Sequence, residues 1–127
     1  MIRGEGFSIV CLRHWRITED EVVIIETSIF TRIIKEMMTD DEYCELQKAL
    51  ISRPDIGDLI KKSGGLRKIR WKLQNRGKSG GIRVIYYWMV SSEQIYMLYT
   101  YPKGKQGNLT SQQLAALKQI VERWSNE

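Results

Sequence analysis

Apolar residues recur at helical spacing in the first half of the chain, which predicts two consecutive helices. Residues 29–38 place their apolar side chains on one stripe, and Thr27 or Ser28 can cap the helix that carries it. A second helix is expected to begin at Thr39, where Thr-Asp-Asp-Glu matches a capping box. It is expected to end at Arg53, because the residue before a proline disfavours the α conformation.

Short β-branched runs and alternating segments predict the strands. A buried strand is expected at 22–25, and three more at 66–73, 82–90 and 94–101, with a loop between the second helix and the first of these three. Because the last three strands are consecutive in the chain, they are expected to be antiparallel neighbours. A third helix follows a capping box at Thr110. This order predicts an α+β domain: an antiparallel sheet of about four strands, two N-terminal helices and one C-terminal helix.

Length and composition indicate one domain with an extension. The chain has 127 residues, and residues 1–20 show no clear period, so they are expected to form an N-terminal extension, disordered or with a short extra strand, before a domain at 21–127. No apolar run approaches the roughly 18 residues of a membrane span, and no secretory signal is visible. Cys11 and Cys44 have no metal-type spacing and are expected to be reduced thiols.

Positive charge is concentrated in the second half of the chain. Between Asp58 and Glu93 there are nine basic residues and no acidic one, while the whole chain has net charge +5. Since these residues alternate with apolar ones on predicted strands, they form a rigid surface of one sign, which is typical of a site for a polyanion. The nine residues are Lys61, Lys62, Arg67, Lys68, Arg70, Lys72, Arg76, Lys78 and Arg83.

Strand alternation divides these basic side chains between the two faces of the sheet. Lys68, Arg70 and Lys72 are expected on one face, and Arg67 on the other. Arg83, expected to be an exposed strand arginine, can converge with Lys68, Arg70 and Lys103 on one patch. Two interpretations stay open: a solvated basic face without chemistry, or a phosphate site in which nearby aromatic rings stack on bases instead of filling the core. The nearby aromatic residues are Trp71, Tyr86, Tyr87, Trp88, Tyr99 and Tyr101.

Several kinds of catalytic site do not fit the sequence. The single histidine, His14, lies in the extension, which argues against a two-histidine ribonuclease and against a triad. No His, Cys, Asp and Glu residues have metal-ligand spacing, and neither Gly-Gly pair leads into a P-loop, so no metal and no cofactor are expected. Phosphoryl transfer from an RNA 2′-hydroxyl fits better, because arginines can stabilise the developing charge and a lysine can transfer the proton.

Three motifs carry a resemblance to a known family. They read Gly-Gly-Leu-Arg-Lys-Ile-Arg at 64–70, Gly-Lys-Ser-Gly-Gly-Ile-Arg-Val-Ile-Tyr-Tyr at 77–87 and Leu-Tyr-Thr-Tyr-Pro-Lys at 98–103. Together they resemble the RelE/ParE toxin superfamily, and most of all its HigB-like branch, over about 21–124. The resemblance implies a RelE-like fold and a small cytoplasmic toxin of a toxin–antitoxin pair that cuts mRNA in the ribosomal A site without metal.

The resemblance also implies roles for individual residues. Arg83 matches the family's strand arginine that contacts the scissile phosphate, Lys68 and Arg70 match its basic pair, and Lys103 or Lys105 matches the basic residue after the last strand. Some RelE-like toxins have a base-stacking tyrosine near the C-terminus, but the corresponding residues 107–110 here are Gly-Asn-Leu-Thr. The further residues expected to bind RNA are Arg67, Lys72, Arg76, Lys78 and Lys105.

The function predicted from the sequence is a ribosome-dependent mRNA endonuclease of a type II toxin–antitoxin system. Its expected partners are the ribosome, mRNA and a cognate antitoxin, of helix-turn-helix type by resemblance, with no membrane partner. One alternative is a ParE-like inhibitor of DNA gyrase, which has the same fold. The other is a non-catalytic RNA-binding module, such as a decayed toxin.

Overall fold

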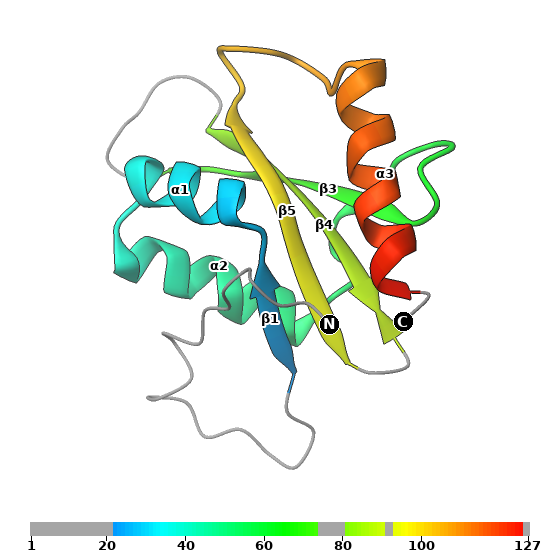
Figure 1. Ribbon diagram of the computed structural model, residues 1–127. Coiled ribbons are helices and arrows are strands. Elements are labelled where there is room, and N and C mark those ends of the chain that lie inside the picture. The colour runs from blue at the N-terminus through cyan, green and yellow to red at the C-terminus, as the bar shows by residue number, and fades with distance from the viewer. Residues whose placement is uncertain (1–21, 74–80, 91–92, 126–127) are drawn as a thin grey trace.

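The computed structural model describes residues 22–73, 81–90 and 93–125 of the chain, which fold as an α+β domain (Figure 1). The predicted fold class is therefore confirmed. The elements in chain order are β1 (Val23–Glu26), α1 (Ser28–Met37), α2 (Asp40–Ser52), β2 (Asp58–Leu59), β3 (Leu66–Trp71), β4 (Ile82–Met89), β5 (Gln94–Pro102) and α3 (Ser111–Ser125).

The sheet has five strands in the order β1-β5-β4-β3-β2. Strands β2 to β5 pair antiparallel with their neighbours, while β1 pairs parallel with β5. Compared with the expected antiparallel sheet of about four strands, this sheet has one additional strand and one parallel pair. The additional strand, β2, is only two residues long, too short for a periodic pattern, and it lies in the segment expected to be a loop. Parallel pairing of β1 requires a long connection, which α1 and the following elements supply.

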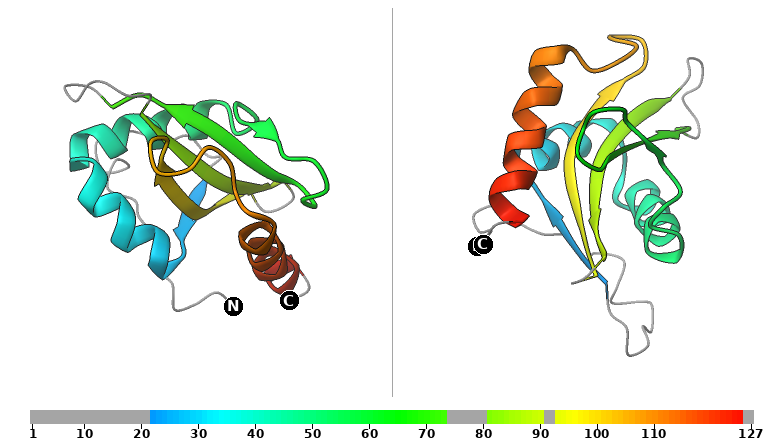
Figure 2. Two further views of the ribbon diagram at one scale, coloured as in Figure 1. Left: turned by 90° about the horizontal axis from the view of Figure 1, so that it is seen from above. Right: turned by 90° about the vertical axis from the view of Figure 1, so that its right-hand side faces the viewer.

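Helices cover both faces of the sheet. Helices α1 and α2 pack on one face and α3 on the other, as the view from above shows (Figure 2). Each face has its own apolar core. The core beneath α1 and α2 contains Ile24, Phe30, Ile34, Met38, Tyr43, Leu46, Leu50, Ile69, Ile82, Val84, Tyr86, Ile95 and Met97. The core beneath α3 contains Leu66, Ile85, Tyr96, Leu98, Tyr101, Leu117 and Val121.

The predicted helix starts are confirmed. The Thr27 hydroxyl caps α1, and Thr39 forms the expected capping box with Glu42 at the start of α2. At α3, the Thr110 hydroxyl accepts from the Gln113 N–H at 3.1 Å, while the Thr110 N–H donates to Gln113 Oε1 at 3.0 Å. Side-chain capping satisfies backbone groups that have no partner inside the helix, so these short motifs fix the helix boundaries locally.

A bulge in β5 changes which of its residues face each side of the sheet. In the register with β4, Ile85 lies opposite Tyr99 and Tyr86 opposite Met97, so Leu98 has no partner in that register. The Thr27 hydroxyl donates to the Leu98 carbonyl at 2.9 Å and so holds the bulged residue. Because one extra residue shifts the alternation, the bulge turns the tyrosines that follow it toward the α3 face.

One expectation from composition falls partly outside the described residues: Cys44 lies on α2, but Cys11 is not described. None of the helices in the described part of the chain is long and apolar enough to cross a bilayer.

Candidate functional site

Two cross-strand rows build the site on the α3 face of the sheet. Arg70 of β3 lies opposite Arg83 of β4, which lies opposite Tyr101 of β5. Directly opposite residues of antiparallel strands share a face, so these three side chains form one row. A second row, two residues along, is formed by Lys68, Ile85 and Tyr99. We call Lys68, Arg70 and Arg83 the basic patch.

Arg83 is the buried member of the basic patch. Its side chain is only 8% exposed, so the expectation of an exposed strand arginine is wrong. One of its terminal nitrogens, Nη1, lies 3.4 Å from the Ile82 carbonyl to which it donates. A central strand between two others leaves little room for solvent, and sequence alternation alone does not reveal this. The burial fixes the position of the guanidinium, but it also makes Arg83 part of the packing.

Lys68 is held by a residue that sequence reasoning did not identify. Its Nζ donates to Asn108 Oδ1 at 3.0 Å, across 40 positions of the chain. Asn108 belongs to the loop between β5 and α3, where Gln106 Nε2 donates to both the Asn108 carbonyl (2.7 Å) and Gln113 Oε1 (3.0 Å). No pattern in the sequence relates Asn108 to Lys68, since the contact depends on how this loop returns over the sheet.

Lys103 follows β5 at the end of the sheet that carries Arg70 and Arg83. The Lys103 N–H donates to the Gly81 carbonyl at 3.0 Å, which ties this segment to the start of β4. Gly81 has φ +69°, and a Cβ there would collide with the carbonyl oxygen of Trp71, so only glycine fits. Lys103 and Lys105 are both exposed. The structure thus brings the backbone of Lys103 close to the basic patch.

Arg67 lies on the opposite face and is bound by the protein itself. It pairs with Tyr86 across β3 and β4, and its Nη1 donates to the carbonyls of Gly57 (2.7 Å) and Asp55 (3.2 Å). Its expected role in RNA binding is not supported by this position.

Lys72 was expected on the same face as Lys68 and Arg70. It follows the last residue of β3 and lines a cleft beside α2, together with Trp71 and three acidic residues. These acids are Asp41, Glu42 and Glu45. Alternation no longer applies there, because β3 ends at Trp71. Arg76 and Lys78 lie outside the described residues.

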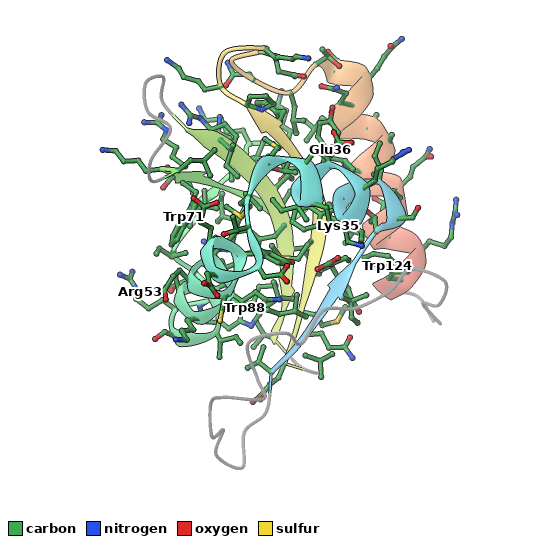
Figure 3. All side chains as sticks on the ribbon, turned by 90° about the vertical axis from the view of Figure 1, so that its left-hand side faces the viewer. Lys35, Glu36, Arg53, Trp71, Trp88 and Trp124 are labelled. Atoms are coloured by element: carbon green, nitrogen blue, oxygen red, sulfur yellow. The ribbon has the colours of Figure 1, made fainter. Side chains whose placement is uncertain are left out.

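The six aromatic residues near the basic segment separate between the two faces. Trp71 and Trp88 lie on the side of the sheet that α1 and α2 cover, as the labelled side chains show, and Tyr86 belongs to the same core (Figure 3). Tyr87 packs in the α3 core, while Tyr99 and Tyr101 continue the rows of the basic patch. The sequence could not single out these two tyrosines, because the bulge at Leu98 decides their face.

The side chains of the site provide hydrogen-bond donors above all. Lysine and arginine have donors and no acceptor, and the ion pairs of Lys48 with Glu45 and of Arg53 with Asp55 lie elsewhere. Burial raises the pKa of Tyr101, as does Tyr99, while the charge of Arg83 opposes the rise, so the phenol keeps its proton at neutral pH. Within the described part of the chain, no three His, Cys, Asp or Glu side chains gather as metal ligands. The arrangement suits an anion such as a phosphate.

A comparison with protein families identifies the family of this chain. The model of the RelE toxin of RelE/RelB toxin–antitoxin systems matches residues 22–127, a range that includes every helix and strand described above. The chain therefore belongs to the RelE toxin family, whose members act as the toxins of toxin–antitoxin systems.

Proposed function

We propose that this protein is a ribosome-dependent mRNA endonuclease of the HigB-like branch, and that the basic patch is its active site. The observation that carries the proposal is the cross-strand register, which puts Arg70 directly opposite Arg83 and Lys68 on the same face two residues away. Three cations on one rigid face, together with the donors beside them, can bind one phosphate and the groups next to it.

The proposed reaction is an in-line transfer within the RNA strand. The 2′-oxygen attacks the neighbouring phosphorus, the bond to the 5′-oxygen breaks, and a 2′,3′-cyclic phosphate forms. Arg83 and Arg70 stabilise the charge on the non-bridging oxygens, a contribution of about 3 kcal/mol for a well-placed donor. Lys68 is the residue best suited to give a proton to the leaving 5′-oxygen, because an ammonium group can release a proton and a guanidinium cannot, while the proton of the 2′-hydroxyl passes to water. Lys103 then supplies a further phosphate contact.

The ribosome has a defined part in this proposal. The basic patch can hold RNA by charge, but charge alone does not align a 2′-hydroxyl with the phosphorus and the leaving oxygen. Orientation accounts for a large share of such a barrier, and the message in the ribosomal A site is already ordered. We therefore expect the protein to act in the cytoplasm, where its substrate is translated message.

A cognate antitoxin is the other expected partner. We expect a helix-turn-helix protein whose acidic or amphipathic segment covers the basic patch or the N-terminal part of α3 beside it. Like charges on neighbouring strands repel one another, and a complementary partner relieves that repulsion. The association rate should therefore fall as salt is raised.

Cell-free translation with purified protein tests the proposal and separates it from its rivals. The expected result is arrest of translation with new 5′ ends in ribosome-bound message. A gyrase inhibitor would leave translation running but block DNA supercoiling, and a decayed toxin would do neither. Either of these two results would overturn the proposal.

A matched pair of variants locates the activity on the protein. Arg70 is an exposed arginine of the basic patch, and Arg32 is an exposed arginine on α1, on the other side of the sheet. Replacing either with alanine is expected to change stability by less than about 0.5 kcal/mol. Arg70→Ala should lose most of the arrest, and Arg32→Ala should keep it. Equal activity of the two variants would place the site elsewhere.

A further inference from the structure

The hydroxyl of Tyr101 is buried without a partner. The side chain is 3% exposed, and its Oη makes no hydrogen bond within the described part of the chain. The nearby Tyr96 and Tyr99 differ, since the Tyr96 hydroxyl donates to Gln94 at 2.7 Å and the Tyr99 hydroxyl accepts from Gln113 at 3.4 Å. A buried hydroxyl without a hydrogen bond costs about 1–3 kcal/mol, so its presence calls for a reason.

The surroundings of Tyr101 indicate what partner is missing. It completes the row of Arg70 and Arg83, and arginine offers donors and no acceptor. Because the phenol keeps its proton at neutral pH, all three side chains of the row can donate to a common group. The group that accepts several donors beside two positive charges is an anion with several oxygens, such as a phosphate.

We propose that Tyr101 donates its hydroxyl hydrogen to a non-bridging oxygen of the RNA phosphate that Arg83 binds, which makes Tyr101 a further substrate-contacting residue. This inference rests on the proposed function of the same site. The hydroxyl is closed to solvent in the free protein, so the phosphate reaches it only when side chains at this end of the sheet move. Arg70 is exposed and lies in the same row, and we expect its side chain to move outward when the RNA strand binds.

The variant Tyr101→Phe removes only the hydroxyl and keeps the ring in the core. Tyr96→Phe is the matched control, because Tyr96 lies on the same strand and face but outside the two rows of the site, and its hydroxyl already donates to Gln94. Binding of a short single-stranded RNA is measured by fluorescence anisotropy at low salt. Urea unfolding of the same samples follows the folded state, and single-turnover cleavage of ribosome-bound message follows the reaction.

The expected result is that Tyr101→Phe is at least as stable as the wild type, because a buried unpaired hydroxyl is lost. It should nevertheless bind the RNA about 10-fold more weakly and cleave about 10- to 100-fold more slowly, as for a hydrogen bond to a charged group. Tyr96→Phe should bind and cleave the RNA as the wild type does. Unchanged RNA binding by Tyr101→Phe would overturn the inference and would point to a buried water as the partner of the hydroxyl. Weaker binding by Tyr101→Phe, with no cleavage even by the wild type, would keep the phosphate contact and reject the nuclease.

Discussion

The two faces of the sheet each carry a cross-strand pair of arginine and tyrosine, and the two pairs differ in where their hydrogen bonds go. Arg67 and Tyr86 face α1 and α2, where Arg67 donates to two backbone carbonyls. Tyr86 Oη donates to the Pro54 carbonyl at 2.7 Å and accepts from the Gly57 N–H at 2.8 Å. Arg83 and Tyr101 face the α3 side, and the Tyr101 hydroxyl has no partner among the described residues.

The difference separates a pair whose hydrogen bonds are made within the fold from a pair in which we propose that the tyrosine binds a ligand. The first pair clamps the segment after α2 onto the sheet, so its donors and acceptors are used by the fold. In the second pair, the Tyr101 hydroxyl makes no hydrogen bond among the described residues. We therefore expect the same two residue types to have different roles on the two faces of the sheet, and only their surroundings distinguish them.

Replacing Arg83 should have the largest effect on activity. Arg83→Ala is expected to lower the single-turnover rate of message cleavage by about 100- to 1000-fold, because a preorganised donor to the developing charge is lost. Since the side chain is 8% exposed, the variant should also lose stability through its packing, which circular dichroism and urea unfolding will measure.

Arg83→Lys separates these two effects. Lysine keeps the charge and most of the aliphatic stem but cannot form two parallel hydrogen bonds to a phosphate. We expect a variant that unfolds close to the wild-type urea concentration and still cleaves more slowly. Wild-type cleavage by a folded Arg83→Ala or Arg83→Lys protein would show that Arg83 does not contact the reacting phosphate.

Tyr86→Phe should affect stability and leave the chemistry intact. The substitution leaves the buried Gly57 N–H without its acceptor, so the free energy of unfolding should fall by about 1–3 kcal/mol. Cleavage by the fraction that remains folded should match the wild type. An unchanged free energy of unfolding would mean that the hydrogen bonds of the Tyr86 hydroxyl do not stabilise the fold.

Arg67→Ala tests the contacts that β3 makes with the same segment after α2, and its expected effect on stability is smaller. Its contacts to backbone carbonyls are partly exposed to solvent, so the loss in unfolding free energy should be about 1 kcal/mol. RNA binding, measured by anisotropy, should stay within about twofold of the wild type. A loss of RNA binding as large as that of Arg70→Ala would show that Arg67 binds RNA.

Alkaline pH gives the smallest of the expected effects. Burial raises the pKa of both Tyr86 and Tyr101 above the usual value of about 10, so each phenol is deprotonated more readily in the unfolded chain than in the folded one. Below about pH 10 these two phenols therefore do not lower the free energy of unfolding. As the pH rises through that value, the free energy of unfolding falls by at most about 1.4 kcal/mol per pH unit for each tyrosine. Urea unfolding from pH 8 to 11 measures the slope, and each phenylalanine variant should flatten it. A slope that neither substitution changes would show that the raised pKa values of Tyr86 and Tyr101 do not cause the loss of stability.

The local parts of this fold follow from the sequence, and the site follows from it only in part. Three capping motifs predicted the helix starts, and alternation put Lys68 and Arg70 on the face that also carries Arg83. These features depend on residues close in the chain.

The features that sequence reasoning missed depend on contacts between distant residues. The parallel β1, the burial of Arg83 and the contact of Asn108 with Lys68 arise from the packing of elements far apart in the chain. The bulge at Leu98, held by Thr27 from another element, decides the face of Tyr99 and Tyr101.

The need for the ribosome is tested by the cleavage rate of one message under two conditions. The same labelled mRNA is mixed with excess purified protein, either free in solution or bound to ribosomes with an empty A site, and 5′ ends are mapped over time. We expect rapid cuts in the ribosome-bound message, located at the A site, and little cleavage of the free message. Equally fast and specific cleavage of the free message, with contaminating nuclease excluded, or no cleavage under either condition, would contradict it.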